Sequence, residues 1–256
     1  MLPLKDNIPT RRPPILTIAI IVACVFVYFF LQKGGINGPS DQSVVKYAAI
    51  PYEITHPGKE CGLTTGGTVG CQGTGGIPAS TPAPSQPATW LTVLFAMFMH
   101  GGLLHLGGNM LFLWIFGNNI EDSMSRWRFV LFYLLGGLVA TAAQVAVDPS
   151  STTPTLGASG AIAAVLGGYA LLYPRARVIT LIFIIIIFTV IELPALLVLG
   201  LWFLLQLLDA SAQPLTGGGV AYFAHIGGFV FGLLLIRLFA NHVHSDYDRA
   251  SRIPVY

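Results

Sequence analysis

The sequence predicts an all-α, polytopic membrane protein built as a six-helix transmembrane bundle. Hydrophobic residues make up 54% of the 256-residue chain and charged residues only 9%, whereas globular domains carry about 25% charged residues. A soluble protein this apolar has too few polar side chains to cover its surface. The apolar residues also gather in separate runs, each close to the length of about 20 residues that a membrane-crossing helix needs. The net charge of +2 gives no reason to expect nucleic acid as a partner.

The first apolar run covers residues 15–32 and follows a basic segment that contains Lys5, Arg11 and Arg12. A cleaved signal peptide is the alternative interpretation of such a run. The run is long for a signal peptide, and the sequence GGIN at 34–37 is a poor cleavage site. We therefore expect a retained span, with residues 1–14 as a cytoplasmic tail.

A long polar segment at 33–89 separates the first span from the second, and we expect it to be an outer loop. It is rich in Gly, Pro, Thr and Ser between residues 58 and 87, so we expect a flexible insert there. Cys61 and Cys71 lie in this insert, and a disulfide and two free thiols fit the sequence equally well. Cys24 lies inside the first apolar run and is expected to pack there.

The remaining spans are expected at 103–120, 129–147, 159–173, 193–208 and 221–240. The apolar stretch 178–208 is too long for one span and too short for two, and Glu192 and Pro194 interrupt it. We place the span in its second part and expect residues 182–188 on the membrane surface or dipping into it. Residues 15–240 form the predicted membrane domain, and 241–256 a cytoplasmic tail.

The distribution of Lys and Arg predicts the orientation, because these residues favour cytoplasmic loops. Arg126 and Arg128 follow the second span, and Arg175 and Arg177 follow the fourth. The alternate loops, 148–158 and 209–220, contain neither Lys nor Arg. This alternation fits an even number of spans with both termini in the cytoplasm, which we place at the plasma membrane.

With this topology the second, fourth and sixth spans all run from outside to inside, and each begins with unusual residues. Polar groups inside a membrane are costly and usually face a bundle interior or a wet cavity. Three clusters distant in the chain are thus expected at one depth near the outer surface. Their members are His100, His105 and Asn109; Gly157, Ser159 and Gly160; and His225, Gly228 and Gly232.

The chemistry follows from these residue types. A serine is a weak nucleophile until a base takes its proton, and a neutral histidine is such a base. Ser159 and His225 are the natural pair. The acidic residues Asp148, Glu192 and Asp209 are expected at other depths, so the simplest interpretation is a dyad without a carboxylate.

Acyl transfer also needs hydrogen-bond donors for the developing oxyanion. His105 and Asn109 are four residues apart and share a helical face. The backbone amide of Ser159 lies at a helix start, where amides have no helical partner. His100 is expected to hold the loop or to bind water near the oxyanion.

Small residues next to these groups permit close helix packing. Gly157 and Gly160 flank the serine, and Gly160, Ala164 and Gly168 form a stripe along the fourth span. Gly228 and Gly232 form a GxxxG pair on the sixth span. We expect the two spans to approach closely enough for Ser159 and His225 to hydrogen-bond.

At these residues the sequence resembles the rhomboid family of intramembrane serine proteases. The resemblance rests on His100, His105 and Asn109 as HxxxxHxxxN, on the GxSG motif at 157–160, and on the AHxxGxxxG motif at 224–232. It implies a rhomboid-like six-helix fold, with Ser159 as nucleophile and His225 as base. It also implies a water-filled cavity open to the outside, and a lateral gate formed by span five and the loop before span six.

The resemblance further implies single-span membrane proteins as substrates, the lipid bilayer as surroundings, and no cofactor or metal. The chain departs from some relatives at Ala163, where they carry an aromatic residue that packs on the histidine. Another side chain must therefore orient His225.

Two other classes of function are a non-catalytic relative that binds membrane segments and a transporter or channel. The presence of both Ser159 and His225 disfavours the first, and the lack of an internal repeat disfavours the second.

Overall fold

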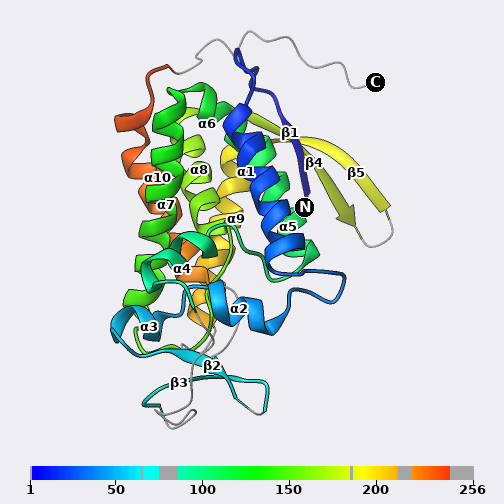
Figure 1. Ribbon diagram of the computed structural model, residues 1–256. Coiled ribbons are helices and arrows are strands. Elements are labelled where there is room, and N and C mark those ends of the chain that lie inside the picture. The colour runs from blue at the N-terminus through cyan, green and yellow to red at the C-terminus, as the bar shows by residue number, and fades with distance from the viewer. Residues whose placement is uncertain (1, 65, 75–85, 185–186, 213–220, 243–256) are drawn as a thin grey trace.

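The computed structural model describes residues 2–64, 66–74, 86–184, 187–212 and 221–242. Long helices stand side by side as a bundle, a small sheet lies along one side, and short helices and a hairpin cover one end (Figure 1). The long helices are α1 (Ile15–Phe26), α5 (Leu103–Phe112), α7 (Arg126–Val147), α8 (Ser159–Leu172), α9 (Ala195–Ala212) and α10 (Tyr222–Phe239). Each overlaps one of the six ranges predicted from the sequence.

Two of the long helices continue beyond their α-helical part. A π-helical turn, Val27–Leu31, extends α1, and a second one, Leu113–Gly117, joins α5 to α6 (Asn118–Asp122). Among the described residues, α7 and α10 are long and apolar enough to cross a membrane by themselves. The apolar helices Ile15–Leu31, Ser159–Leu172 and Ala195–Ser211 are shorter. The number of membrane crossings therefore stays a prediction.

The fold is mostly helical, as expected, but it is not all-α, because a three-stranded antiparallel sheet accompanies the helices. Its strands are β1 (Leu2–Asp6), β4 (Arg177–Ile184) and β5 (Ile187–Pro194), in the order β1-β4-β5. The segment that forms β4 and β5 is rich in Ile, Val, Thr and Phe, which favour strands. Residues 182–188, expected at the membrane surface, include the paired ends of β4 and β5, while 185–186 lie outside the described residues. The following helix begins at Ala195, directly after Pro194.

The first residues, expected to form a tail, pack against the helices through β1. The Asp6 carboxylate accepts hydrogen bonds from Asn119 Nδ2 and from the Tyr169 hydroxyl, both at 2.6 Å. Burial raises the pKa of Asp6 to about 6. This contact joins the sheet to α6 and α8.

A second polar contact fixes the start of α1. The Glu121 carboxylate accepts hydrogen bonds from the backbone amides of Leu16 at 3.0 Å and Thr17 at 2.8 Å, and from Thr17 Oγ1 at 2.8 Å. These amides belong to the first helical turn, which has no partners within the helix. Arg12 adds an ion pair to Asp122 at 3.1 Å. The end of α6 therefore holds the beginning of α1.

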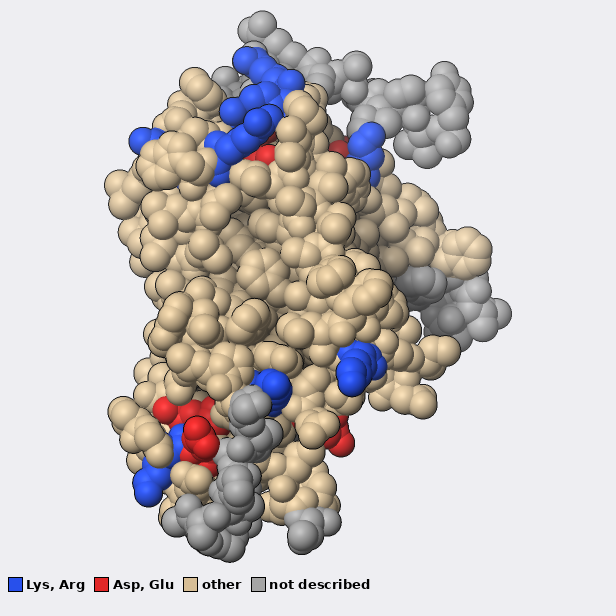
Figure 2. Space-filling view, viewed as in Figure 1, with Lys and Arg blue, Asp and Glu red and all other residues tan. Residues whose placement is uncertain are grey.

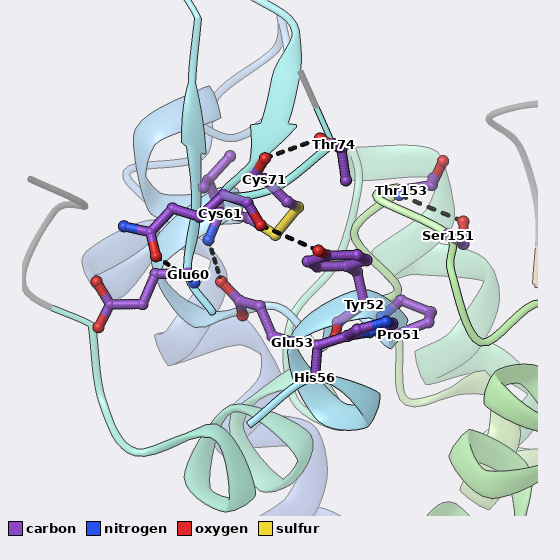
Figure 3. Close-up of a disulfide and its surroundings, with 12 residues drawn as sticks. Pro51, Tyr52, Glu53, His56, Glu60, Cys61, Cys71, Thr74, Ser151 and Thr153 are labelled. Atoms are coloured by element: carbon purple, nitrogen blue, oxygen red, sulfur yellow. Dashed lines mark hydrogen bonds between the residues drawn. A yellow bond between two sulfur atoms is a disulfide. The ribbon is translucent and has the colours of Figure 1, made fainter. Parts of the chain in front are cut away.

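The segment at 33–89 contains several short regular elements where the structure describes it. These are α2 (Asp41–Tyr47), α3 (Pro51–Thr55), β2 (Cys61–Leu63) and β3 (Val69–Cys71), with α4 starting at its end (Thr89–Ala96). Cys61 and Cys71 form a disulfide across the β2–β3 hairpin, which decides between the two alternatives left open by the sequence (Figure 3). Residues 65 and 75–85 of the insert expected to be flexible lie outside the described residues.

The hairpin is tied to α3 by a buried carboxylate. The Cys61 amide donates a hydrogen bond to Glu53 Oε1 at 2.7 Å, and the Tyr52 hydroxyl donates one to the Gln72 carbonyl at 3.0 Å (Figure 3). Burial raises the pKa of Glu53 to about 7. In contrast, Cys24 is a buried free thiol, as expected.

Helix α8 lies in the interior of the bundle, and small residues let α10 come close to it. A Cβ atom added to Gly228 would collide with the carbonyl oxygen of Gly160, and one added to Gly232 with that of Ala164. The predicted close approach of these two helices is therefore present. On the face shown in Figure 2, charged side chains gather toward the two ends, and a broad uncharged belt lies between them.

Candidate active site

Ser159 and His225 lie within hydrogen-bond distance at the first turns of α8 and α10. The distance between Ser159 Oγ and His225 Nε2 is 2.7 Å. His225 is buried, and its neighbours Ala224 and Gly228 belong to the face of α10 that packs on α8. The two side chains are thus brought together by the same helix contact that the glycines allow.

Gly157 shapes the turn that leads into the serine. Its φ of +138° lies in the region that favours glycine, and its amide donates a hydrogen bond to the Ala96 carbonyl at 2.9 Å. A Cβ atom at this position would lie 3.2 Å from Ser159 Oγ and 3.3 Å from His105 Nε2. The absence of a side chain here leaves the space between these two atoms open.

A cavity of about 760 Å³ opens over the Ser159–His225 pair. In the described part of the chain, none of the residues that line it is Asp or Glu. Its walls come from the segment after α1, the start of α5, the segment before α8, and the helices α7, α9 and α10. Residues that contribute to it are Asn37, His105, Asn109, Gln144, Thr155, Ser159, Trp202 and His225.

His105 and Asn109 both line this cavity from α5. The Gly101 amide donates a hydrogen bond to His105 Nδ1 at 3.3 Å, which leaves the proton of the neutral ring on Nε2. Asn109 Nδ2 is buried and makes no hydrogen bond within the described part of the chain. Both side chains therefore share the cavity with Ser159 and can donate a hydrogen bond there.

His100 is buried behind the cavity and does not line it. Its backbone is clamped by Gln32: the His100 amide donates to Gln32 Oε1, and Gln32 Nε2 donates to the His100 carbonyl, both at 2.9 Å. Its ring meets the ring of His105 edge-on, with centroids 5.3 Å apart. Both bonds to Gln32 use the backbone of residue 100, and the His100 ring lies against His105.

The side chain that contacts the other ring nitrogen of His225 is Gln206 of α9. The distance from Gln206 Oε1 to His225 Nδ1 is 2.6 Å. The rings of Trp202 and Tyr222 also flank His225, with centroids 5.7 Å and 6.5 Å away. Gln206, Trp202 and Tyr222 therefore surround His225, next to a chain position 163 that holds only alanine. Among the described residues, no three His, Cys, Asp or Glu side chains gather in a way that holds a metal ion.

The rhomboid domain family matches residues 87–242, which include α4 to α10 and every residue of the pair and its cavity donors. The chain belongs to the rhomboid family.

Several curated rhomboid proteins are similar to part of the chain. "Rhomboid protein 1, mitochondrial" of Saccharomyces cerevisiae is 30% identical over 151 residues, which cover 56% of this chain and 40% of that protein. "Presenilin-associated rhomboid-like protein A, mitochondrial" of Danio rerio is 28% identical over 158 residues, or 61% and 39% of the two chains. "Rhomboid protease GluP" of Bacillus subtilis is 39% identical over 84 residues, or 33% and 16%. The matched region spans two fifths or less of the length of these relatives.

Membership in the rhomboid family, together with two described helices long and apolar enough to cross a bilayer, identifies the chain as a membrane protein. The motif at 157–160 leads into the start of α8, the one at 224–232 lies on α10, and those at 100–109 lie before and on α5.

Sequence reasoning missed two glutamines of this site. Gln206 is the only amide side chain in the otherwise apolar range 195–208, and Gln32 ends the first apolar run. Both positions carried a signal, because a polar side chain in a membrane segment is costly unless it has a partner. Their partners, His225 and His100, are distant in the sequence and became visible only in the fold.

Proposed function

We propose that this rhomboid-family chain is an intramembrane serine endopeptidase that cuts single-span membrane proteins within or near their membrane segments. The observation that carries the proposal is the 2.7 Å contact between Ser159 Oγ and His225 Nε2 inside an open cavity. In this mechanism His225 takes the hydroxyl proton while Ser159 Oγ attacks the carbonyl carbon of the substrate. The proton then passes to the leaving amine, and water hydrolyses the resulting ester.

The oxyanion of the tetrahedral intermediate needs donors that are in place before it forms. We assign this role to His105 Nε2–H, Asn109 Nδ2 and the backbone amide of Ser159. The free donor capacity of His105 and Asn109 supports the assignment, as does the position of Ser159 at the start of α8. His100 supports His105 through the ring contact.

The substrate class follows from the surroundings of the pair. A cavity of about 760 Å³ with polar and apolar lining residues admits an extended peptide segment and the water that hydrolysis requires. We infer that it opens to the outer side of a plasma membrane, with both chain termini in the cytoplasm. The absence of Lys and Arg from 148–158, the segment just before Ser159, supports this orientation.

The experiment is cleavage of a fluorescent single-span substrate in liposomes by the full chain and its variants. Ser159→Ala and His225→Ala should each abolish turnover. Ser211→Ala is the matched control, because its hydroxyl is exposed on α9 and donates to the Leu208 carbonyl, away from His225. Hydrolysis that survives Ser159→Ala would refute the mechanism.

A non-catalytic relative would behave differently in the same assay. It would bind the substrate helix and leave it uncut, with equal binding by wild type and Ser159→Ala. Binding without Ser159-dependent product would therefore replace the proposed function with a role in holding membrane segments.

A further inference from the structure

Gln206 holds the histidine of the Ser159–His225 pair from a third helix. It is buried, although the stretch 195–208 that carries it is otherwise apolar and largely exposed. Its contact with His225 Nδ1, at 2.6 Å, is as short as the contact of the same ring with Ser159. A buried amide in such a helix is costly unless its groups are paired, and here both ends of the amide have partners.

The orientation of the amide determines the protonation of the ring. Gln206 Nε2 donates to the backbone carbonyl of Trp202, four residues earlier on α9, at 3.4 Å. This contact turns Oε1 toward His225. Because a carbonyl oxygen only accepts, His225 Nδ1 must carry the proton. The lone pair of the neutral ring is then on Nε2, the nitrogen that faces Ser159 Oγ.

We propose that Gln206 is a positioning residue that keeps His225 in the tautomer able to accept the proton of Ser159. This inference rests on the proposed function, since it assigns a partner to the proposed base. Gln206 orients the ring of His225, as the acidic residue of a catalytic triad orients its histidine. Unlike an acidic residue, it brings no negative charge into the apolar surroundings. It also explains how His225 is held although Ala163 offers no ring to pack against it.

Gln206 lies on α9, whereas Ser159 and His225 lie on α8 and α10. Ser159 and His225 are joined by the interlocked helices α8 and α10, where Gly228 and Gly232 leave no room for a side chain. A displacement of α9 would therefore remove the acceptor from Nδ1 while the Ser159–His225 distance is kept. The tautomer of His225, and with it the ability of Nε2 to accept the Ser159 proton, thus depends on the position of α9.

The test uses the full chain in liposomes with two substitutions of similar size. Gln206→Met removes the acceptor and keeps the length of the side chain, whereas Gln206→Glu keeps an oxygen acceptor. We expect Gln206→Met to lower kcat about 10–100-fold with KM nearly unchanged, and Gln206→Glu to retain kcat within about threefold of wild type. Leu205→Met is the matched control, because Leu205 is the neighbouring exposed residue on α9. Full kcat in Gln206→Met, or equal losses in Met and Glu variants, would overturn the inference.

A second measurement is independent of turnover. Long-range proton–nitrogen NMR of histidine-labelled protein in micelles reports which ring nitrogen carries the proton, and His225→Ala identifies the His225 signals. We expect a single Nδ1–H tautomer in wild type and a mixture in Gln206→Met. An unchanged His225 spectrum in Gln206→Met would overturn the role of Gln206 even if Ser159-dependent cleavage is observed. Lack of cleavage by wild type, with the expected spectra, would instead refute the proposed function alone.

Discussion

Close packing of α10 on α8 brings Ser159 and His225 together, and a substitution at Gly232 tests whether this packing is required. In Gly232→Ala the new Cβ atom would lie 2.7 Å from the carbonyl carbon of Ala164 and closer still to its oxygen. These are backbone atoms, which cannot turn away as a side chain can, so the helices must move apart. Separating the helices in this way lowers the free energy of unfolding by about 1–3 kcal/mol. Because the contacted atoms belong to the backbone, we expect a value near the upper end of this range.

The same substitution also brings a gain, because alanine favours a helix over glycine by up to about 1 kcal/mol. The net loss in the free energy of unfolding is therefore about 2 kcal/mol for Gly232→Ala. Gly200→Ala on α9 is the control, since a Cβ atom there meets nothing within 4 Å. It should gain up to about 1 kcal/mol. The expected difference between the variants, about 3 kcal/mol, corresponds to about 6–12 °C in Tm for a chain of this size.

Thermal unfolding in detergent, followed by tryptophan fluorescence, measures this difference. Turnover of the single-span substrate at 25 °C should fall in Gly232→Ala as well, since separation of α8 and α10 lengthens the Ser159–His225 contact. If Gly232→Ala and Gly200→Ala melt within about 2 °C of each other, close packing at Gly232 does not hold the two helices together.

Three further predictions concern other parts of the molecule. His105→Ala and Asn109→Ala should each lower turnover by up to about 10²–10³-fold if each supplies an oxyanion donor; unchanged kcat in both variants would remove them from that role. Glu121→Gln should lower the free energy of unfolding by about 1–3 kcal/mol, because its carboxylate accepts three hydrogen bonds from the start of α1; an unchanged Tm would contradict this. Burial raises the pKa of Glu53 from 4.5 to about 7, so the folded state binds the extra proton and stability falls as pH rises through that interval. Glu53→Gln should lose this share of the pH dependence of Tm, and an identical profile in both proteins would argue against a raised pKa.

The positions of the long helices could be predicted from the sequence, because lipid-spanning segments need long apolar runs whatever they contact. The strands could not. The apolar stretch 178–208 has the composition of a membrane segment, and the antiparallel pairing of β1 with β4 joins residues more than 170 positions apart. The Cys61–Cys71 disulfide likewise depends on the hairpin that brings the two sulfur atoms together.

The sequence by itself determined the chemical identity of the candidate site. Residue types and spacing pointed to Ser159, His225, His105 and Asn109, since these motifs are local in the chain and each lies at the start of an apolar run. Only the tertiary structure decided what holds them. Gln206 reaches His225, and Gln32 clamps His100, through contacts between helices whose rotation and depth no local pattern encodes. Orientation of a side chain depends on which face of a neighbouring helix is turned toward it, and packing of the whole bundle sets that face.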